Sequence, residues 1–157
     1  MAKTLAAGAP LPDVTLPDAQ GEPVRLHDVP RPFVVYFYPA DDTPGCTTEA
    51  CTFRDQYEEF TDAGATVVGI SPDSQEKHAA FAAKHDLPFT LLSDSRHEAR
   101  KAFGVPKLLG LLTGRVSFVI GRDGTVIHVF NSLRQASRHV EEALEAVRQE
   151  QARAPAA

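Results

Sequence analysis

The feature that most constrains the fold is a run of six apolar and aromatic residues, Phe33–Tyr38, without a charge or a turn-forming residue. A continuous β-branched and aromatic run is typical of a strand buried on both faces of a sheet. We therefore expect this strand at the centre of the molecule. Helical and strand patterns then alternate along the chain, which favours an α/β fold with a parallel sheet component.

The other elements follow from periodicity, caps and turn residues. Ala9–Val29, with four prolines and Gly21, predicts an irregular N-terminal hairpin. The predicted helices are about Pro44–Asp62, Ser74–His85 and Arg134–Gln149, with a short one that is capped by Asp94 or Ser95 and ends at Gly104. The predicted strands are Thr66–Ile70 and Phe89–Leu92, followed by a hairpin of Arg115–Ile120 with Thr125–Phe130. We expect one domain over residues 1–150 and a frayed tail over 151–157.

Composition narrows the classes of function. The 157 residues are 43% hydrophobic and carry a net charge of −5, without the basic patch that a nucleic-acid partner requires. Every apolar run falls far short of the roughly 20 residues of a membrane span. The segment Met1–Pro10 does not read as a secretory signal, so a cytoplasmic location is expected. Two cysteines in that compartment predict a catalytic or redox use.

Cys46 is the residue whose setting predicts chemistry. Thr43 suits the N-cap of the helix and Pro44 its first position, so Cys46 falls in the first helical turn. Unpaired backbone N–H groups and the positive end of the helix dipole stabilise a thiolate there. Ala50, Phe53, Tyr57 and Phe60 continue one buried stripe from Cys46, at intervals of four and three residues. The sequence therefore predicts a shielded, ionised sulfur at the carboxyl end of the central strand.

Cys51 lies five residues further along the same helix. Helical geometry places the two Cα atoms about 8 to 9 Å apart, beyond the roughly 7 Å limit for a disulfide. A Cys46–Cys51 bond would thus require the first helical turns to unwind. The predicted cycle is oxidation of Cys46 to a sulfenic acid, local unwinding, attack by Cys51 and reduction by an external dithiol.

These residues resemble a known family. Pro39, Thr43 and Cys46 match the Pro-x-x-x-Thr-x-x-Cys motif of peroxiredoxins, and the spacing to Cys51 is similar to that of the bacterioferritin comigratory protein, or peroxiredoxin Q, subgroup. The resemblance extends over nearly the whole chain. It implies a thioredoxin-like fold, with a central mixed sheet flanked by helices and an N-terminal hairpin extension.

The resemblance also implies an activity and its residues. Cys46 would be the peroxidatic nucleophile, Cys51 the resolving thiol, Thr43 the hydroxyl that binds peroxide, Arg115 the adjacent cation and Pro39 a shield against water. A guanidinium suits this site, since negative charge builds on the departing oxygen. Glu49 could orient Arg115. The implied substrates are hydrogen peroxide and organic hydroperoxides, and the implied reductant is thioredoxin or a similar dithiol. No metal or cofactor is needed, and the chain is expected to be a monomer or homodimer.

Plainer interpretations stand beside these. Cys46 could be a small core residue, Cys51 a spectator thiol, Thr43 only a cap and Arg115 an ordinary strand arginine. The histidines show no metal-ligand spacing and are assigned to surface or packing, and the adjacent Asp41 and Asp42 to a solvated loop. The apolar segment Leu108–Leu112 either lines the pocket or forms a dimer patch.

Two other classes of function remain open. A disulfide oxidoreductase would share the fold, but its usual Cys-x-x-Cys pair is missing from this sequence. A non-catalytic binding module on the same scaffold is the second alternative, because a fold does not fix a function. Reaction with peroxide separates the three classes.

Overall fold

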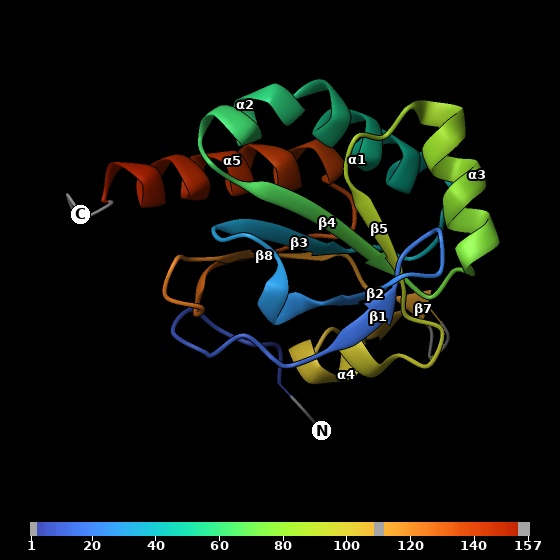
Figure 1. Cartoon of the computed structure of the whole chain (residues 1–157), viewed down its shortest axis with the longest axis horizontal. Helices are drawn as coiled ribbons and strands as arrows, with labels where there is room; N and C mark the ends of the chain where they lie inside the picture. The colour runs from blue at the N-terminus through green and yellow to red at the C-terminus, as the bar shows by residue number, and fades with distance from the viewer. Residues whose placement is uncertain (1–2, 109–111, 154–157) are drawn as a thin grey trace.

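The computed structural model describes residues 3–108 and 112–153. A five-stranded mixed sheet forms its centre, in the order β5-β4-β3-β8-β9 (Figure 1). Strand β3 (Phe33–Phe37) is central and buried throughout, as predicted. It pairs in parallel with β4 (Thr66–Ser71), which pairs in parallel with β5 (Thr90–Ser93). On its other side it pairs antiparallel with β8 (Val116–Ile120), which continues to β9 (Val126–Asn131).

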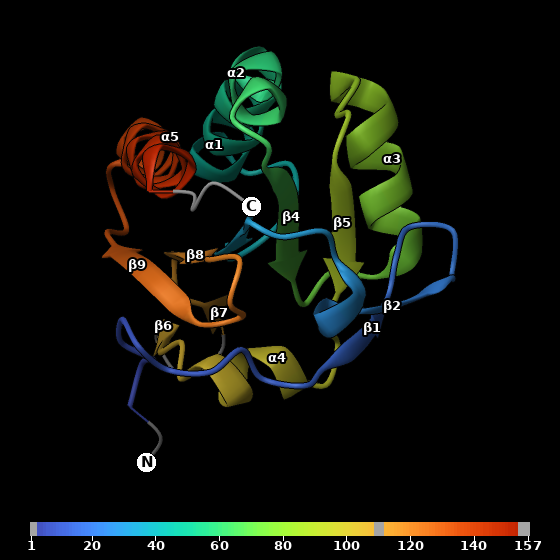
Figure 2. The same ribbon diagram turned by 60° about the vertical axis from the view of Figure 1, so that its left-hand side comes forward.

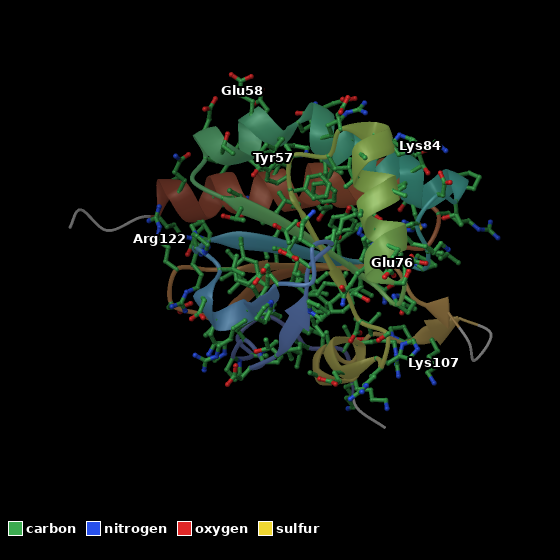
Figure 3. All side chains as sticks on the ribbon, turned by 45° about the vertical axis from the view of Figure 1, so that its right-hand side comes forward. Tyr57, Glu58, Glu76, Lys84, Lys107 and Arg122 are labelled. Atoms are coloured by element: carbon green, nitrogen blue, oxygen red, sulfur yellow. The ribbon has the colours of Figure 1, made fainter. Side chains whose placement is uncertain are left out.

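Helices cover one face of this sheet. Strand β3 is followed by α1 (Pro44–Asp55) and α2 (Tyr57–Asp62), and these lie on the same side as α3 (Gln75–His85) and α5 (Ala136–Ala152) (Figure 2). Figure 3 labels Tyr57 at the start of α2, and its ring lies 6.2 Å from that of Phe89. The core on this face contains the predicted stripe of Cys46, Ala50, Phe53 and Phe60, with Tyr57 partly buried against it.

The other face is covered by the N-terminal segment and by α4 (Glu98–Phe103). Strands β1 (Thr15–Pro17) and β2 (Pro23–Arg25) form the expected hairpin and are followed by a 3₁₀ turn at Leu26–Asp28. Helix α4 ends at Gly104, whose φ of 69° is the left-handed conformation that glycine favours. The predicted thioredoxin-like arrangement, a mixed sheet between helices with an N-terminal strand pair, is confirmed.

Two helices and one strand pair differ from the prediction. The helix predicted over Pro44–Asp62 is broken at Gln56, which is not helical (φ −100°, ψ 7°). The last helix continues to Ala152, so the frayed tail does not begin at Gln151. Before β8, the short strands β6 (Lys107–Leu108) and β7 (Leu112–Thr113) pair antiparallel, which was not predicted. Residues 109–111 lie outside the described residues, so the two interpretations of Leu108–Leu112 stay predictions. Within the described parts of the chain, no helix is long and apolar enough to cross a membrane.

Candidate active site

Cys46 is the third residue of α1 and is 1% exposed. The loop that leaves β3 leads directly into this helix, so the sulfur lies near the carboxyl end of the central strand, as predicted. Backbone N–H groups in the first turn of a helix have no partner within the helix, and the helix dipole is positive there. Cys46 is thus a free, buried thiol in the first turn of a helix.

Arg115 supplies a cation beside the sulfur. Val116, the first residue of β8, pairs with Phe37 of β3, so the residue before it lies next to the end of the central strand. The Nη2 atom of Arg115 donates to Cys46 Sγ at 3.3 Å, and its Nε donates to the backbone oxygen of Leu133 at 3.1 Å. A side chain on Gly45 would approach Nη2 to 3.0 Å, so glycine at this position leaves room for the guanidinium.

Glu49 accepts a hydrogen bond from the third nitrogen of the guanidinium, Nη1. Its Oε1 accepts from Arg115 Nη1 at 2.6 Å, and its side chain is fully buried. Burial raises the pKa of Glu49 to about 8, although Arg115 opposes the shift. The other oxygen, Oε2, has no hydrogen-bond partner among the described residues. Near neutral pH this raised pKa favours a protonated Glu49, and a neutral carboxyl leaves the charge of Arg115 available to the sulfur of Cys46.

His139 of α5 closes the site behind Glu49, with Nδ1 at 3.7 Å from Glu49 Oε2. Its Nε2 donates to the backbone oxygen of Ser132 at 2.7 Å, and its Nδ1 accepts from Ser117 Oγ at 2.7 Å. Burial lowers the pKa of His139 to about 4. The imidazole is therefore neutral at pH 7 and adds no charge beside Arg115.

Thr43 and Pro39 lie on the loop that leads to Cys46. Thr43 occupies the N-cap position, but its side chain makes no cap hydrogen bond; Oγ1 donates to the backbone oxygen of Ala40 at 2.8 Å. The expectation that this hydroxyl caps the helix is therefore wrong. Pro39 is buried directly after β3. Arg115 hydrogen-bonds both Cys46 and Glu49, whereas among the described residues the side chain of Thr43 bonds Ala40 and not the sulfur.

Cys51 lies on α1, half-buried and free. Its sulfur contacts Nδ1 of His85 at 3.7 Å, from the end of α3. Both thiols are thus reduced, and the helix between them is intact.

The two adjacent aspartates differ in their surroundings. Asp42 is exposed and accepts from Lys84 at 3.0 Å. Asp41 is buried: its carboxylate meets Tyr38 Oη at 2.5 Å and His78 Nδ1 at 2.6 Å, and its backbone N–H donates to Asp73 at 2.6 Å. The prediction of a solvated loop is therefore wrong for Asp41, because hydrogen bonds replace its hydration. This network anchors the loop that carries Pro39 and Thr43.

Sequence reasoning missed the roles of Gly45, Asp41 and three histidines. His78 lies 37 residues from Asp41, His85 lies 34 from Cys51 and His139 lies 22 from Ser117. Each pair comes from different elements, so no local spacing reveals it. The one available signal was Gly45, since glycine beside a reactive side chain often permits a close approach.

Comparison with known proteins found similar sequences and similar structures. The family model described as the AhpC/TSA family matches residues 7–129. Chloroplastic peroxiredoxin Q of Sedum lineare is 53% identical over 139 residues, 87% of this chain and 75% of that protein. The crystal structure of peroxidoxin BcpB from Mycobacterium tuberculosis superposes with a TM-score of 0.86 at 41% identity, over 92% of this chain and 97% of that one. A structure of the Xanthomonas campestris bacterioferritin comigratory protein, described for its alkyl peroxide reduction activity, has a TM-score of 0.79 at 31% identity, over 90% and 98% of the two chains.

Two facts qualify these matches. The chain spans 63% to 67% of the length of seven further chloroplastic relatives. The names of these relatives also contradict the predicted cytoplasmic location, because each of these eight relatives is named as a chloroplastic protein. The composition of the first ten residues was therefore not a sound basis for a location.

Proposed function

The chain belongs to the AhpC/TSA family, among the peroxiredoxin Q and bacterioferritin comigratory proteins, and on this premise we propose that it is a thiol peroxidase with Cys46 as its nucleophile. The observation that carries the assignment of the nucleophile is the contact between Arg115 Nη2 and Cys46 Sγ, 3.3 Å long, at the start of a helix. A cation and helix N–H groups around one buried sulfur can stabilise negative charge there, and the thiolate is the reactive form of a cysteine.

In the first step the thiolate attacks one oxygen of the peroxide. An S–O bond forms, the O–O bond breaks, and the departing oxygen leaves as an alkoxide or hydroxide that takes a proton from water. Negative charge moves from the sulfur to this oxygen, and Arg115 faces the reacting sulfur throughout. The Arg115 donors toward Glu49 and Leu133 keep the guanidinium in this orientation. Cys46 becomes a sulfenic acid.

In the second step Cys51 attacks the sulfur of that sulfenic acid. An S–S bond forms and the S–O bond breaks, so that water is released. The intact α1 separates the two thiols, and local unwinding of its first turns brings them together. A thioredoxin-type dithiol then reduces the disulfide by exchange. Hydrogen peroxide and organic hydroperoxides are the proposed substrates, and alkyl peroxide reduction by the Xanthomonas campestris relative supports the second class.

Rapid mixing of the reduced chain with hydrogen peroxide tests this proposal. We expect fast oxidation of Cys46, lost in Cys46→Ser, and an intramolecular disulfide visible by mass spectrometry after one equivalent of peroxide. The Cys51→Ser variant should oxidise at the same rate and accumulate sulfenic acid. Fast reaction with disulfides in place of peroxide would assign the chain to the disulfide oxidoreductases, and reaction with neither would make it a binding module.

A further inference from the structure

The surroundings of Cys51 contain a base that the proposed function has not used. His85, the last residue of α3, places Nδ1 at 3.7 Å from Cys51 Sγ. Figure 3 labels the neighbouring Lys84 at this end of α3. A sulfur to nitrogen contact of this length is a weak hydrogen bond, which the thiol donates when His85 carries its ring proton on Nε2.

Packing fixes the imidazole in this position. Its ring lies edge-on to Phe81, 5.0 Å between centroids, and the backbone oxygen of His85 accepts from Arg54 Nη1 at 2.9 Å. The other ring nitrogen, Nε2, is buried and has no hydrogen-bond partner in the described part of the chain. Cys51 is therefore the polar group that the ring meets, and a buried nitrogen left unpaired in a native protein calls for an explanation.

We propose that His85 is the general base of the resolving step, a role that rests on the proposed function. Nδ1 takes the thiol proton of Cys51 as its sulfur attacks the sulfenic acid of Cys46. The S–H bond breaks and an N–H bond forms on His85, while the S–S bond forms and the S–O bond breaks. The departing hydroxide then takes the proton back from His85 and leaves as water.

Ordinary acid strengths show why a base matters at this sulfur. An ordinary thiol, ionising near pH 8.5, is only about 3% thiolate at pH 7, whereas about three quarters of ordinary imidazole groups are neutral and able to accept a proton. A positioned general base accelerates proton transfer by roughly 10² to 10⁴ fold. Cys51, in the middle of α1, lacks the helix-start setting of Cys46.

The Cys51–His85 pair survives the unwinding that the second step requires. Cys46 is on the first turn of α1, whereas Phe53, beyond Cys51, is fully buried in the core. Arg54, on the same turn as Cys51, is held by the backbone of His85. Loss of the first turns therefore moves Cys46, while Cys51 stays beside its base.

The charges around the pair come from three segments. On α1, the cation of Arg54 lies near Cys51 and is itself bonded to Asp55 at 3.0 Å. Lys84 and Asp86 flank His85 at the end of α3, and Asp42 on the loop before α1 accepts from Lys84. Arg54 and Lys84 thus place cations near the pair, and the carboxylates of Asp42, Asp55 and Asp86 lie near these cations.

Separation of the two oxidation steps tests the role of His85. One equivalent of hydrogen peroxide is mixed rapidly with the wild type, His85→Asn and the control His128→Asn, which removes a half-buried histidine bonded to Glu142 on α5. We expect the oxidation of Cys46 to keep its rate in all three proteins. Disulfide formation at pH 7 should slow by about tenfold or more in His85→Asn alone, and the difference should vanish toward pH 9 as thiols ionise unaided.

Chemical rescue distinguishes a base from a packing residue. Added imidazole should restore disulfide formation in His85→Ala, because the small base can enter the space left by the ring. Disulfide formation at the wild-type rate in His85→Asn at pH 7, or a slow His85→Ala variant that imidazole does not accelerate, overturns this inference. A wild type whose Cys46 does not react with peroxide at all overturns the proposed function instead.

Discussion

At the scale of the residue, the site is a set of contacts around one sulfur. Cys46 meets Nη2 of Arg115, whose Nη1 and Nε donate to Glu49 and to the backbone oxygen of Leu133. A planar group with several fixed donors can hold all three partners at once. Arg115 is therefore oriented as well as charged, and its orientation depends on residues from α1 and from the loop before α5.

Replacement of Arg115 separates charge from orientation. We expect Arg115→Ala to slow oxidation of Cys46 by about a hundredfold at pH 7, because a buried donor that stabilises developing charge is lost. Arg115→Lys keeps the positive charge but loses the planar guanidinium with its fixed donors. Its rate of Cys46 oxidation should lie between those of the wild type and Arg115→Ala. Stopped-flow oxidation across a pH series measures both variants. An unchanged pH–rate profile in Arg115→Ala would remove Arg115 from the mechanism.

At the scale of the element, α1 has two tasks that conflict. In the proposed cycle Cys46 reacts at the start of the intact helix, where unpaired N–H groups can stabilise negative charge. The proposed disulfide with Cys51 requires that same turn to open. The stability of the first turns should therefore set the balance between the folded helix, which reacts with peroxide, and the unwound helix, in which Cys51 can reach the sulfenic acid.

Thr48 offers a way to adjust this stability. Its side chain is exposed, and Oγ1 donates to the backbone oxygen of Pro44 at 3.0 Å. Alanine and glycine differ by about 1 kcal/mol in helix propensity, which is roughly a fivefold change in an equilibrium. We expect disulfide formation to be about five times faster in Thr48→Gly than in Thr48→Ala, with Cys46 oxidised at similar rates. Equal rates of disulfide formation would show that unwinding does not limit the second step.

At the scale of the whole molecule, Glu49 links the site to global stability. Its pKa is raised by burial to about 8 in the folded chain, above the ordinary 4.5 of the unfolded chain. Between these values the folded state binds more protons, so the free energy of unfolding falls as the pH rises. The neutral His139, with its pKa lowered to about 4, acts in the opposite sense between pH 6.5 and 4.

Comparison with Glu49→Gln isolates this contribution, because all other titrating groups are shared. Relative to the variant, the wild type should lose stability from pH 5 to pH 8, with a slope of up to about 1.4 kcal/mol per pH unit. Urea unfolding at several pH values measures the difference. If Arg115 instead keeps Glu49 ionised, the wild type will gain stability over the same pH range. The assignment of a protonated Glu49 in the folded chain is then wrong.

The sequence by itself determined most of the elements and the position of the candidate nucleophile. Phe33–Tyr38 predicted the buried central strand, and Thr43 with Pro44 placed Cys46 in a first helical turn, because both signals are local and depend on neighbouring residues. The break at Gln56 and the extension of α5 to Ala152 were missed, since helix ends depend on tertiary contacts as well as on caps.

Only the tertiary structure decided which side chains meet. The antiparallel pairing of β8 with β3 brings Arg115 to Cys46, 69 residues away in sequence, and α3 brings His85 to Cys51. The same packing buries Asp41 against His78, where its neighbour Asp42 stays in water. Hydrogen bonds and pKa shifts depend on distance and on exclusion of water, and neither follows from spacing along the chain once the partners belong to different elements.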